Sequence, residues 1–228
     1  MIKLTHLIGH FCRYGKKNVK IYLVLSFILF FSSSVNKATS QIVFTQQLFD
    51  TIGTTYGVSA QQRVQEWQKV IQDNQDKDID VQLYNVNRFF NQIEFVDDIK
   101  HWKKSDYWAT PLEFIGTNAG DCEDFSIAKY FTLRALGVPD ANLRLMYVKA
   151  LQLNQAHMVL AYYKTEGAIP LVLDNINPRI LPASQRRDLL PVYSFNGNGL
   201  WLGRGKQVQA GGNNTLWNDL INRIKQGK

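Results

Sequence analysis

Acidic residues are absent from the first forty positions, although six lysines and arginines lie there. This basic stretch leads into an apolar run at residues 21–31, and the small residues Ala38-Thr39-Ser40 follow it. These are the parts of a signal peptide, so we expect cleavage after Ser40. An uncleaved amphiphilic anchor is the alternative, because the basic region is unusually long. A transmembrane helix is disfavoured, since it needs about 20 apolar residues and this run is shorter.

The positive charge of the full chain also depends on this segment. The sequence has 26 basic and 19 acidic residues, and without the six N-terminal cations 20 basic residues remain against 19 acidic ones. A nearly neutral chain gives no argument for nucleic-acid binding. The length that remains suits one compact domain. We therefore expect residues 1–40 to be a signal peptide and residues 41–228 to be a single exported domain.

Cysteine is nearly absent, because Cys12 lies in the expected signal peptide and Cys122 is then alone. An internal disulfide is excluded, and the lack of a Cys-x-x-Cys motif gives a thiol-redox protein poor support. A single cysteine in an exported protein is a reactive thiol, an intermolecular linker or a buried small hydrophobic residue. Composition alone leaves these roles of Cys122 open.

Hydrophobic periodicity predicts that the N-terminal half is helical. Apolar residues recur at helical spacing in residues 59–73 and again in residues 81–93. Residues 121–136 are apolar on nearly every side, which is typical of a helix buried on several faces. Gly137 and Pro139 follow and are expected to end this central helix.

Strands are predicted after the helices. Runs rich in Val, Tyr and Leu, separated by polar turns, predict strands at residues 143–150, 157–163 and 171–175. The Gly/Asn-rich segment 196–214 is predicted to be a loop, and residues 216–224 a short helix. Helices followed by a sheet indicate an α+β fold.

Three residues form a candidate catalytic constellation. Cys122 lies at the predicted first turn of the central helix, where free N–H groups and the helix dipole favour a thiolate. His157 begins one predicted strand and Asp174 ends the next, so a hairpin between them would let the two side chains form a hydrogen bond. Either residue alone is more often structural. Their combination with Cys122 predicts a nucleophile, a general base and an orienting carboxylate.

A family resemblance rests on five short segments. They are Gly120-Asp121-Cys122-Glu123-Asp124-Phe125, Ala128-Lys129-Tyr130, Tyr147-Val148-Lys149-Ala150, His157-Met158-Val159-Leu160 and Leu173-Asp174-Asn175. Through them the chain resembles the bacterial transglutaminase-like cysteine proteinases, and among these the LapG-type periplasmic proteases. The resemblance covers roughly residues 61–182 and includes the order and spacing of the candidate triad.

The resemblance implies a fold, a mechanism and a biological setting. The fold is α+β and papain/transglutaminase-like, with a central Cys-bearing helix packed on an antiparallel sheet. Cys122, His157 and Asp174 act through a thioester intermediate. A periplasmic protease of this kind cleaves the N-terminal region of a large surface adhesin at a di-alanine site, which promotes biofilm dispersal. The periplasmic domain of an inner-membrane cyclic-di-GMP receptor inhibits it.

Asp121, Glu123 and Asp124 surround the candidate nucleophile with carboxylates that oppose thiolate formation. A hard cation bound by oxygen atoms would compensate, and calcium suits such a cluster better than zinc. The resemblance also implies calcium at these residues. The alternative is ordinary capping and dipole chemistry in a first helical turn. Further ligands are expected from the preceding loop, where the candidates are Asp97, Asp98 and Asp106.

Two other functions share this sequence pattern. An acyl transferase or amidase would use the same thioester and differ only in whether an amine or water accepts the acyl group. A non-catalytic binding module would keep the fold without the chemistry, but the presence of all three candidate residues argues against it. Cleavage of a candidate adhesin, as opposed to cross-linking, separates the first alternative from a protease.

Overall fold

The computed structural model describes residues 42–203, 206–208 and 215–227. The expected signal peptide, its cleavage site and Cys12 lie outside the described residues. Within these ranges no helix is both long enough and apolar enough to cross a membrane. The described ranges contain every residue to which the sequence assigns a catalytic or metal-binding role.

The helices lie mainly in the first half of the chain, as the sequence predicts. The α-helices are α1 Gln46–Tyr56, α2 Val58–Asn74, α3 Ile79–Phe90, α4 Asp98–His101, α5 Pro111–Thr117, α6 Cys122–Ala135 and α7 Thr215–Lys225. Short 3-10 helices are η1 Asp140–Asn142 and η2 Ala183–Gln185. The predicted helices correspond to α2, α3, α6 and α7. The sequence analysis did not predict α1, α4 or α5.

Nine strands are described, and seven of them form one antiparallel sheet. They are β1 Glu94–Phe95, β2 Ala119–Gly120, β3 Leu143–Ala150, β4 Gln155–Tyr162, β5 Leu171–Leu173, β6 Leu181–Pro182, β7 Leu189–Asn196, β8 Gly199–Leu202 and β9 Lys206–Val208. The sheet has the order β6-β5-β4-β3-β7-β8-β9, and β1 and β2 form a separate parallel pair. The three predicted strands are β3, β4 and β5.

The prediction of a loop over residues 196–214 is wrong for part of that segment. Gly199 to Leu202 form β8, which pairs with β7, and β9 pairs with β8 in turn. Glycine and asparagine disfavour strands only weakly when a neighbouring strand supplies the hydrogen-bonding partners. The side chain of Asn196 tightens the turn into β8, since its Oδ1 accepts from the N–H groups of Asn198 and Gly199 at 2.9 and 3.1 Å. Tertiary pairing therefore overrides the local composition.

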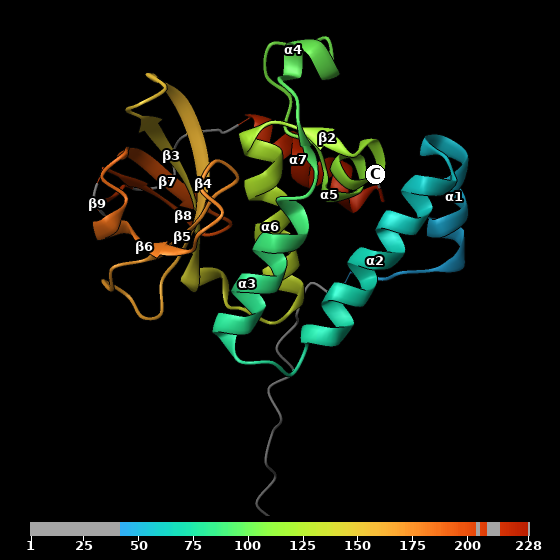
Figure 1. Ribbon diagram of the computed structural model, residues 1–228, viewed down its shortest axis with the longest axis horizontal. Helices are drawn as coiled ribbons and strands as arrows, with labels where there is room; N and C mark the ends of the chain where they lie inside the picture. Colours follow the sequence, from blue (N-terminus) through green and yellow to red (C-terminus); the bar gives the residue numbers. More distant parts are fainter. Residues whose placement is uncertain (1–41, 204–205, 209–214, 228) are drawn as a thin grey trace, which may run out of the picture. The chain divides into compact units, whose positions relative to one another are not determined.

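Helix α6 is central because it packs on two layers. Strands β3 and β4 contact one side of it, while α3 and α5 contact the other (Figure 1). Phe125, Ile127, Ala128 and Leu133 are almost completely buried. A helix that is apolar all round belongs in a protein interior, so the sequence pattern of α6 explains its place between the sheet and the helices.

The chain approaches α6 through a tightly fixed connection. Thr110 caps α5 in a reciprocal box with Glu113, and Asn118 ends that helix in a left-handed conformation with φ 55°. Strand β2 then pairs with β1, which places Phe95 opposite Gly120. A Cβ atom on Gly120 would lie 2.7 Å from the ring of Phe114 and would also overlap the Asp124 carboxylate. Only glycine fits at the last position before the helix cap.

We predict that Gly120→Ala lowers the stability of the fold. The added methyl group must displace Phe114 or Asp124, and overpacking of this kind typically costs about 1–3 kcal/mol. The free energy of unfolding, measured by chemical denaturation, reports the loss. Gly197→Ala is the control, because the nearest atom to its added Cβ lies at 3.5 Å. An equal loss in both variants would contradict the steric explanation.

Candidate active site

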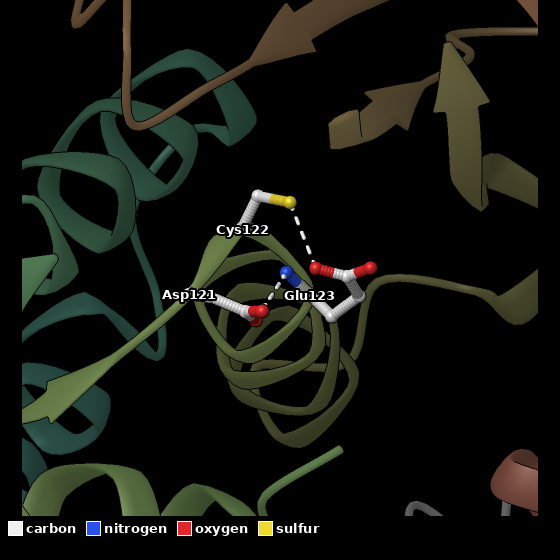
Figure 2. Close-up of side chains that lie close together, drawn as sticks. All are labelled: Asp121, Cys122 and Glu123. Carbon is white, nitrogen blue, oxygen red and sulfur yellow. Dashed lines mark hydrogen bonds between the residues drawn. The ribbon is translucent and has the colours of Figure 1, made fainter. Parts of the chain in front are cut away.

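The N-terminal turn of α6 carries the single described cysteine. Cys122 is the first residue of the helix, and 9% of its surface is exposed. Figure 2 shows its Sγ atom directed at the Glu123 carboxylate, to which the thiol donates at 2.8 Å. The backbone N–H of Glu123 donates to Asp121 Oδ1 at 3.3 Å, so Asp121 caps the helix. The thiol therefore lies at a helix N-terminus, as the sequence predicts, but beside a carboxylate.

His157 and Asp174 form the hydrogen bond that the sequence predicts. Strands β4 and β5 pair with Leu160 opposite Leu173, and Asp174 follows directly after β5. His157 Nε2 and Asp174 Oδ1 are 2.8 Å apart, and both side chains are almost completely buried. The register of two neighbouring strands thus brings the imidazole and the carboxylate together.

Several donors stabilise the ionised form of Asp174. Burial by itself raises the pKa of this carboxyl, but hydrogen bonds from His157, Arg186 and the backbone N–H of Ile176 outweigh it and lower the pKa to about 2. Arg186 donates to Asp174 Oδ2 at 2.6 Å and also pairs with Asp188 at 2.7 Å. An ionised carboxylate only accepts hydrogen bonds, so Nε2 of His157 carries a proton. Nδ1 is then left to accept or release a proton elsewhere.

The thiol and the imidazole come from two layers that touch at one strand. Ser126, one turn after Cys122, donates to the carbonyl of Met158 at 3.0 Å. A backbone hydrogen bond from Met158 also reaches the thiol of Cys122. Since Met158 follows His157 in β4, the packing of α6 on β4 brings Cys122 beside the strand that carries the imidazole.

The surroundings of Cys122 oppose its ionisation. Burial raises the pKa of the thiol well above its ordinary value, and the charges of Glu123 and Asp121 raise it further. The hydrogen bond from the Met158 backbone opposes these effects without overcoming them. The sequence predicts this conflict between a helix N-terminus and neighbouring carboxylates. A compensating positive charge is needed before a thiolate is stable here.

Carboxylates gather next to the thiol in two overlapping groups. Oxygen atoms of Asp98, Asp121 and Asp124 all lie within 4.8 Å of one another, and Asp121 also lies within that distance of Cys122 and Glu123. Glu123 accepts from Tyr147 Oη at 3.0 Å with its other oxygen. Asp97, by contrast, pairs with the exposed Lys100 at 3.2 Å. Of the loop carboxylates that the sequence offers, Asp98 joins Asp121 and Asp124.

The acidic group has the character of a cation site. Burial and the charges of neighbouring carboxylates raise the pKa of Asp98 to about 6, although the hydrogen bond from the Tyr107 backbone opposes them. Burial, and then the charges of Glu123 and Asp124, also raise the pKa of Asp121. Asp98 is 5% exposed, and its Oδ1 atom is buried without a hydrogen-bond partner. Asp124 is almost completely buried, and burial raises its pKa as well. Clustered hard oxygen atoms with an unsatisfied acceptor fit a divalent cation such as calcium.

The loop before α5 holds these carboxylates in place. The backbone N–H of Tyr107 donates to Asp98 Oδ2 at 2.5 Å. The backbone N–H of Ala109 donates to Asp124 Oδ1 at 2.7 Å. Asp124 Oδ2 also accepts from the backbone N–H of Asp121 at 3.4 Å. Asp121 and Asp124 therefore serve as helix caps and as members of the acidic group, so the two interpretations of the sequence coexist.

Some residues of the site escape sequence reasoning. Arg186 lies in a charged segment and no local pattern separates it from Arg187, yet only 3% of Arg186 is exposed. Asn91 ends α3 and its Nδ2 donates to the carbonyl of Asp174 at 2.8 Å. Lys129 is fully buried on α6, and burial lowers its pKa to about 7 although Asp174 opposes the shift. A lysine in an otherwise apolar helix is a signal that could have indicated this last residue.

The chain is similar to known bacterial cysteine proteinases. The family model for bacterial transglutaminase-like cysteine proteinases matches residues 55–189. Legionella pneumophila LapG is 41% identical and superimposes with a TM-score of 0.70, over 81% of this chain and 99% of that chain. A search of curated proteins found no match.

Two further LapG structures were obtained with bound calcium and after EGTA treatment. Calcium-bound Legionella pneumophila LapG matches with 41% identity and a TM-score of 0.70, over 79% of this chain and 99% of that chain. The EGTA-treated form matches with 41% identity and a TM-score of 0.71, over 81% and 99%. The family match, the identity and the nearly complete coverage of LapG lead to one conclusion. The chain belongs to the bacterial transglutaminase-like cysteine proteinase family.

Proposed function

We propose that this cysteine protease is a calcium-dependent periplasmic endopeptidase with Cys122, His157 and Asp174 as its catalytic residues. One observation carries the proposal. Cys122 starts α6, and its thiol accepts a hydrogen bond from the backbone of Met158. His157 precedes Met158 in β4 and is bonded to an ionised Asp174. A thiol at a helix N-terminus, next to a strand that carries an oriented imidazole, supplies the groups that nucleophilic acyl transfer requires.

In the proposed mechanism His157 transfers the protons and Cys122 forms the bond to the substrate. His157 Nδ1 takes the thiol proton, and Cys122 Sγ attacks the scissile carbonyl carbon. The C–N bond breaks as His157 returns the proton to the leaving amine, which leaves a thioester. Water, deprotonated by His157, then breaks the C–S bond and restores the thiol. Asp174 keeps the imidazole oriented and stabilises its cationic form.

The backbone of α6 also has a role. The N–H of Cys122 is at the first helical position, where backbone donors lack intrahelical acceptors. We assign this N–H to the oxyanion that develops on the scissile carbonyl, because preorganised donors are among the strongest sources of rate enhancement. The helix dipole favours the same negative charge.

Asp121, Glu123 and Asp124, the residues that the sequence predicts, would hold the calcium ion together with Asp98. Their clustered oxygen atoms and the unsatisfied Oδ1 of Asp98 support this assignment. Bound calcium would neutralise the carboxylates that oppose ionisation of Cys122. The calcium-bound and EGTA-treated forms of Legionella LapG, 41% identical to this chain, support calcium as the cation. Glu123, which bonds both Cys122 and Tyr147, would link the metal site to the thiol.

The substrate, partner and compartment are proposed from the LapG-type resemblance. The enzyme cleaves the N-terminal region of a large surface adhesin at a di-alanine site, which releases the adhesin and promotes biofilm dispersal. The periplasmic domain of an inner-membrane cyclic-di-GMP receptor binds and inhibits it. The signal-peptide pattern of residues 1–40 supports export to the periplasm.

We predict that Cys122→Ala abolishes cleavage of the N-terminal region of a di-alanine-containing adhesin. The variant loses the nucleophile but keeps its fold, because alanine fits the space of a small buried thiol. Gels and mass spectrometry measure the product, and the melting temperature checks the fold. Undiminished cleavage by folded Cys122→Ala would exclude this residue as nucleophile. Cross-linked product from the unmodified enzyme would favour an acyl transferase.

We predict that a chelator inactivates the enzyme and that calcium restores it. Asp98→Asn should weaken calcium binding roughly 10-fold or more, since it removes charge from a buried oxygen cluster. Isothermal titration with calcium measures the affinity. Asp97→Asn is the matched control, because its side chain pairs with exposed Lys100. Equal calcium affinities in the two variants would contradict the calcium site, and so would an activity that the chelator does not change. The carboxylates would then act only as helix caps.

We predict a specific loss of stability in acid through Asp174. The folded pKa of about 2 is below the ordinary value of 3.8, so this carboxylate stabilises the fold above about pH 4. The contribution, about 2 kcal/mol, should disappear as the pH falls from about 4 to about 2. The difference in unfolding free energy between the unmodified protein and Asp174→Asn measures it. A difference that stays constant down to pH 2 contradicts the prediction, and exposed Asp76→Asn is the control.

A further inference from the structure

Arg223 connects the C-terminal helix to the loop that orders the acidic group. Helix α7 docks through buried Leu220 and through Trp217, which stacks on Phe131 with ring centroids 5.9 Å apart. From this helix Arg223 donates to Glu113 Oε2 and to the carbonyl of Trp108, each at 2.5 Å. The side chain of Arg223 is only 13% exposed. A largely buried guanidinium with two short charge-assisted contacts fixes its partners firmly.

Arg223 and Glu113 also contact other residues of the segment 107–110. The Arg223 guanidinium lies 4.6 Å from the centre of the Tyr107 ring, and Tyr107 Oη donates to Glu113 Oε1 at 2.9 Å. Glu113 Oε2 accepts from the backbone N–H of Thr110 at 2.8 Å. Arg223 and Glu113 therefore hold this segment by a ring, a carbonyl and a backbone N–H.

Two backbone N–H groups of the same segment bond the acidic group. The N–H groups of Tyr107 and Ala109 donate to Asp98 and Asp124. Carboxylates this close repel one another, so their positions depend on such donors. The segment 107–110 thus bonds Arg223 and Glu113 through some of its groups and the carboxylates through two others. The family match ends at residue 189, so α7 adds a constraint from outside the matched region.

We propose that Arg223 is a positioning residue that sets the calcium affinity of Asp98, Asp121 and Asp124 through the segment 107–110. The inference rests on the proposed calcium site and extends it to a residue of the C-terminal helix. Among the described residues, Arg223 bonds Glu113, Asp219 and the carbonyl of Trp108, and it has no hydrogen bond to the acidic group or to Cys122. It keeps the two N–H donors in register with the carboxylates, so the cluster is preorganised for the cation.

The test compares Arg223→Ala with Asp219→Asn, using calcium alone as the ligand. Asp219 is a further partner of Arg223, at 2.9 Å, but 62% of its side chain is exposed and, among the described residues, it forms no hydrogen bond with the segment 107–110. Isothermal titration should show that Arg223→Ala weakens calcium binding roughly 10-fold or more, as loss of outer-shell support typically does. Asp219→Asn should retain the affinity. The melting temperatures show that both variants are folded.

Arg223→Lys keeps the charge and the stem but loses the planar fork, so it tests the geometry if the alanine variant does not fold. We expect a weaker affinity than in the unmodified protein. Either folded variant with a lower melting temperature but unchanged calcium affinity would overturn the proposal, because Arg223 would then support only the fold.

Hydrogen exchange in the presence of a chelator separates this proposal from the calcium assignment. Amides of Tyr107 and Ala109 should exchange faster in Arg223→Ala and Arg223→Lys, while those of β3 keep their protection. If the unmodified protein binds no calcium, the calcium assignment and the affinity role both fail, and exchange at residues 107–110 decides whether Arg223 positions the segment. Unchanged exchange would overturn that positioning role.

Discussion

The site depends on how three carboxylates and a thiol are tolerated at one buried helix terminus. The helix dipole contributes only about 0.3–1 kcal/mol for each carboxylate in a first turn. Taking an ion out of water costs several kcal/mol. Capping by Asp121 and Asp124 therefore does not offset the burial of the whole group in its ionised form, and Asp98 adds a third carboxyl group without capping α6. The surrounding structure supplies backbone donors from residues 107 and 109, and the proposed calcium ion would balance the remaining negative charge.

Asp174 is stabilised in its ionised form in a different way. Asp174 is as deeply buried as Asp124, yet the pKa of Asp174 falls while that of Asp124 rises. The difference lies in the partners, because Asp174 bonds a guanidinium and an imidazole, whereas Asp124 has backbone donors and acidic neighbours. One carboxylate is satisfied by the protein alone. The others have no cationic partner among the described residues, and the proposed calcium ion would take that place.

Much of this could be predicted from the sequence, and the failures have physical causes. The all-round apolar pattern gave α6, and the Val- and Leu-rich runs gave β3, β4 and β5, since these elements are buried and strongly patterned. Strand order then predicted the bond between His157 and Asp174. Helix α5 has only seven residues, too few for a periodic pattern, and β8 exists because β7 pairs with it. Arg186 and Arg223 are distinguished from other arginines only by tertiary contacts. No local pattern reports those contacts.

The layered arrangement has a mechanical consequence. His157 lies in β4 and Asp174 follows β5 directly, so the pairing of these two strands and the bond between the two side chains fix their separation. Cys122 belongs to α6, which touches that sheet through side chains such as Ser126. Side-chain packing permits small shear displacements that a strand ladder resists. Sliding of α6 along β4 would change the gap between sulfur and imidazole and leave the gap between imidazole and carboxylate constant. The distance from imidazole to carboxylate is therefore fixed by the sheet, whereas the distance from sulfur to imidazole depends on how α6 packs. A partner that binds both layers would change only the second distance.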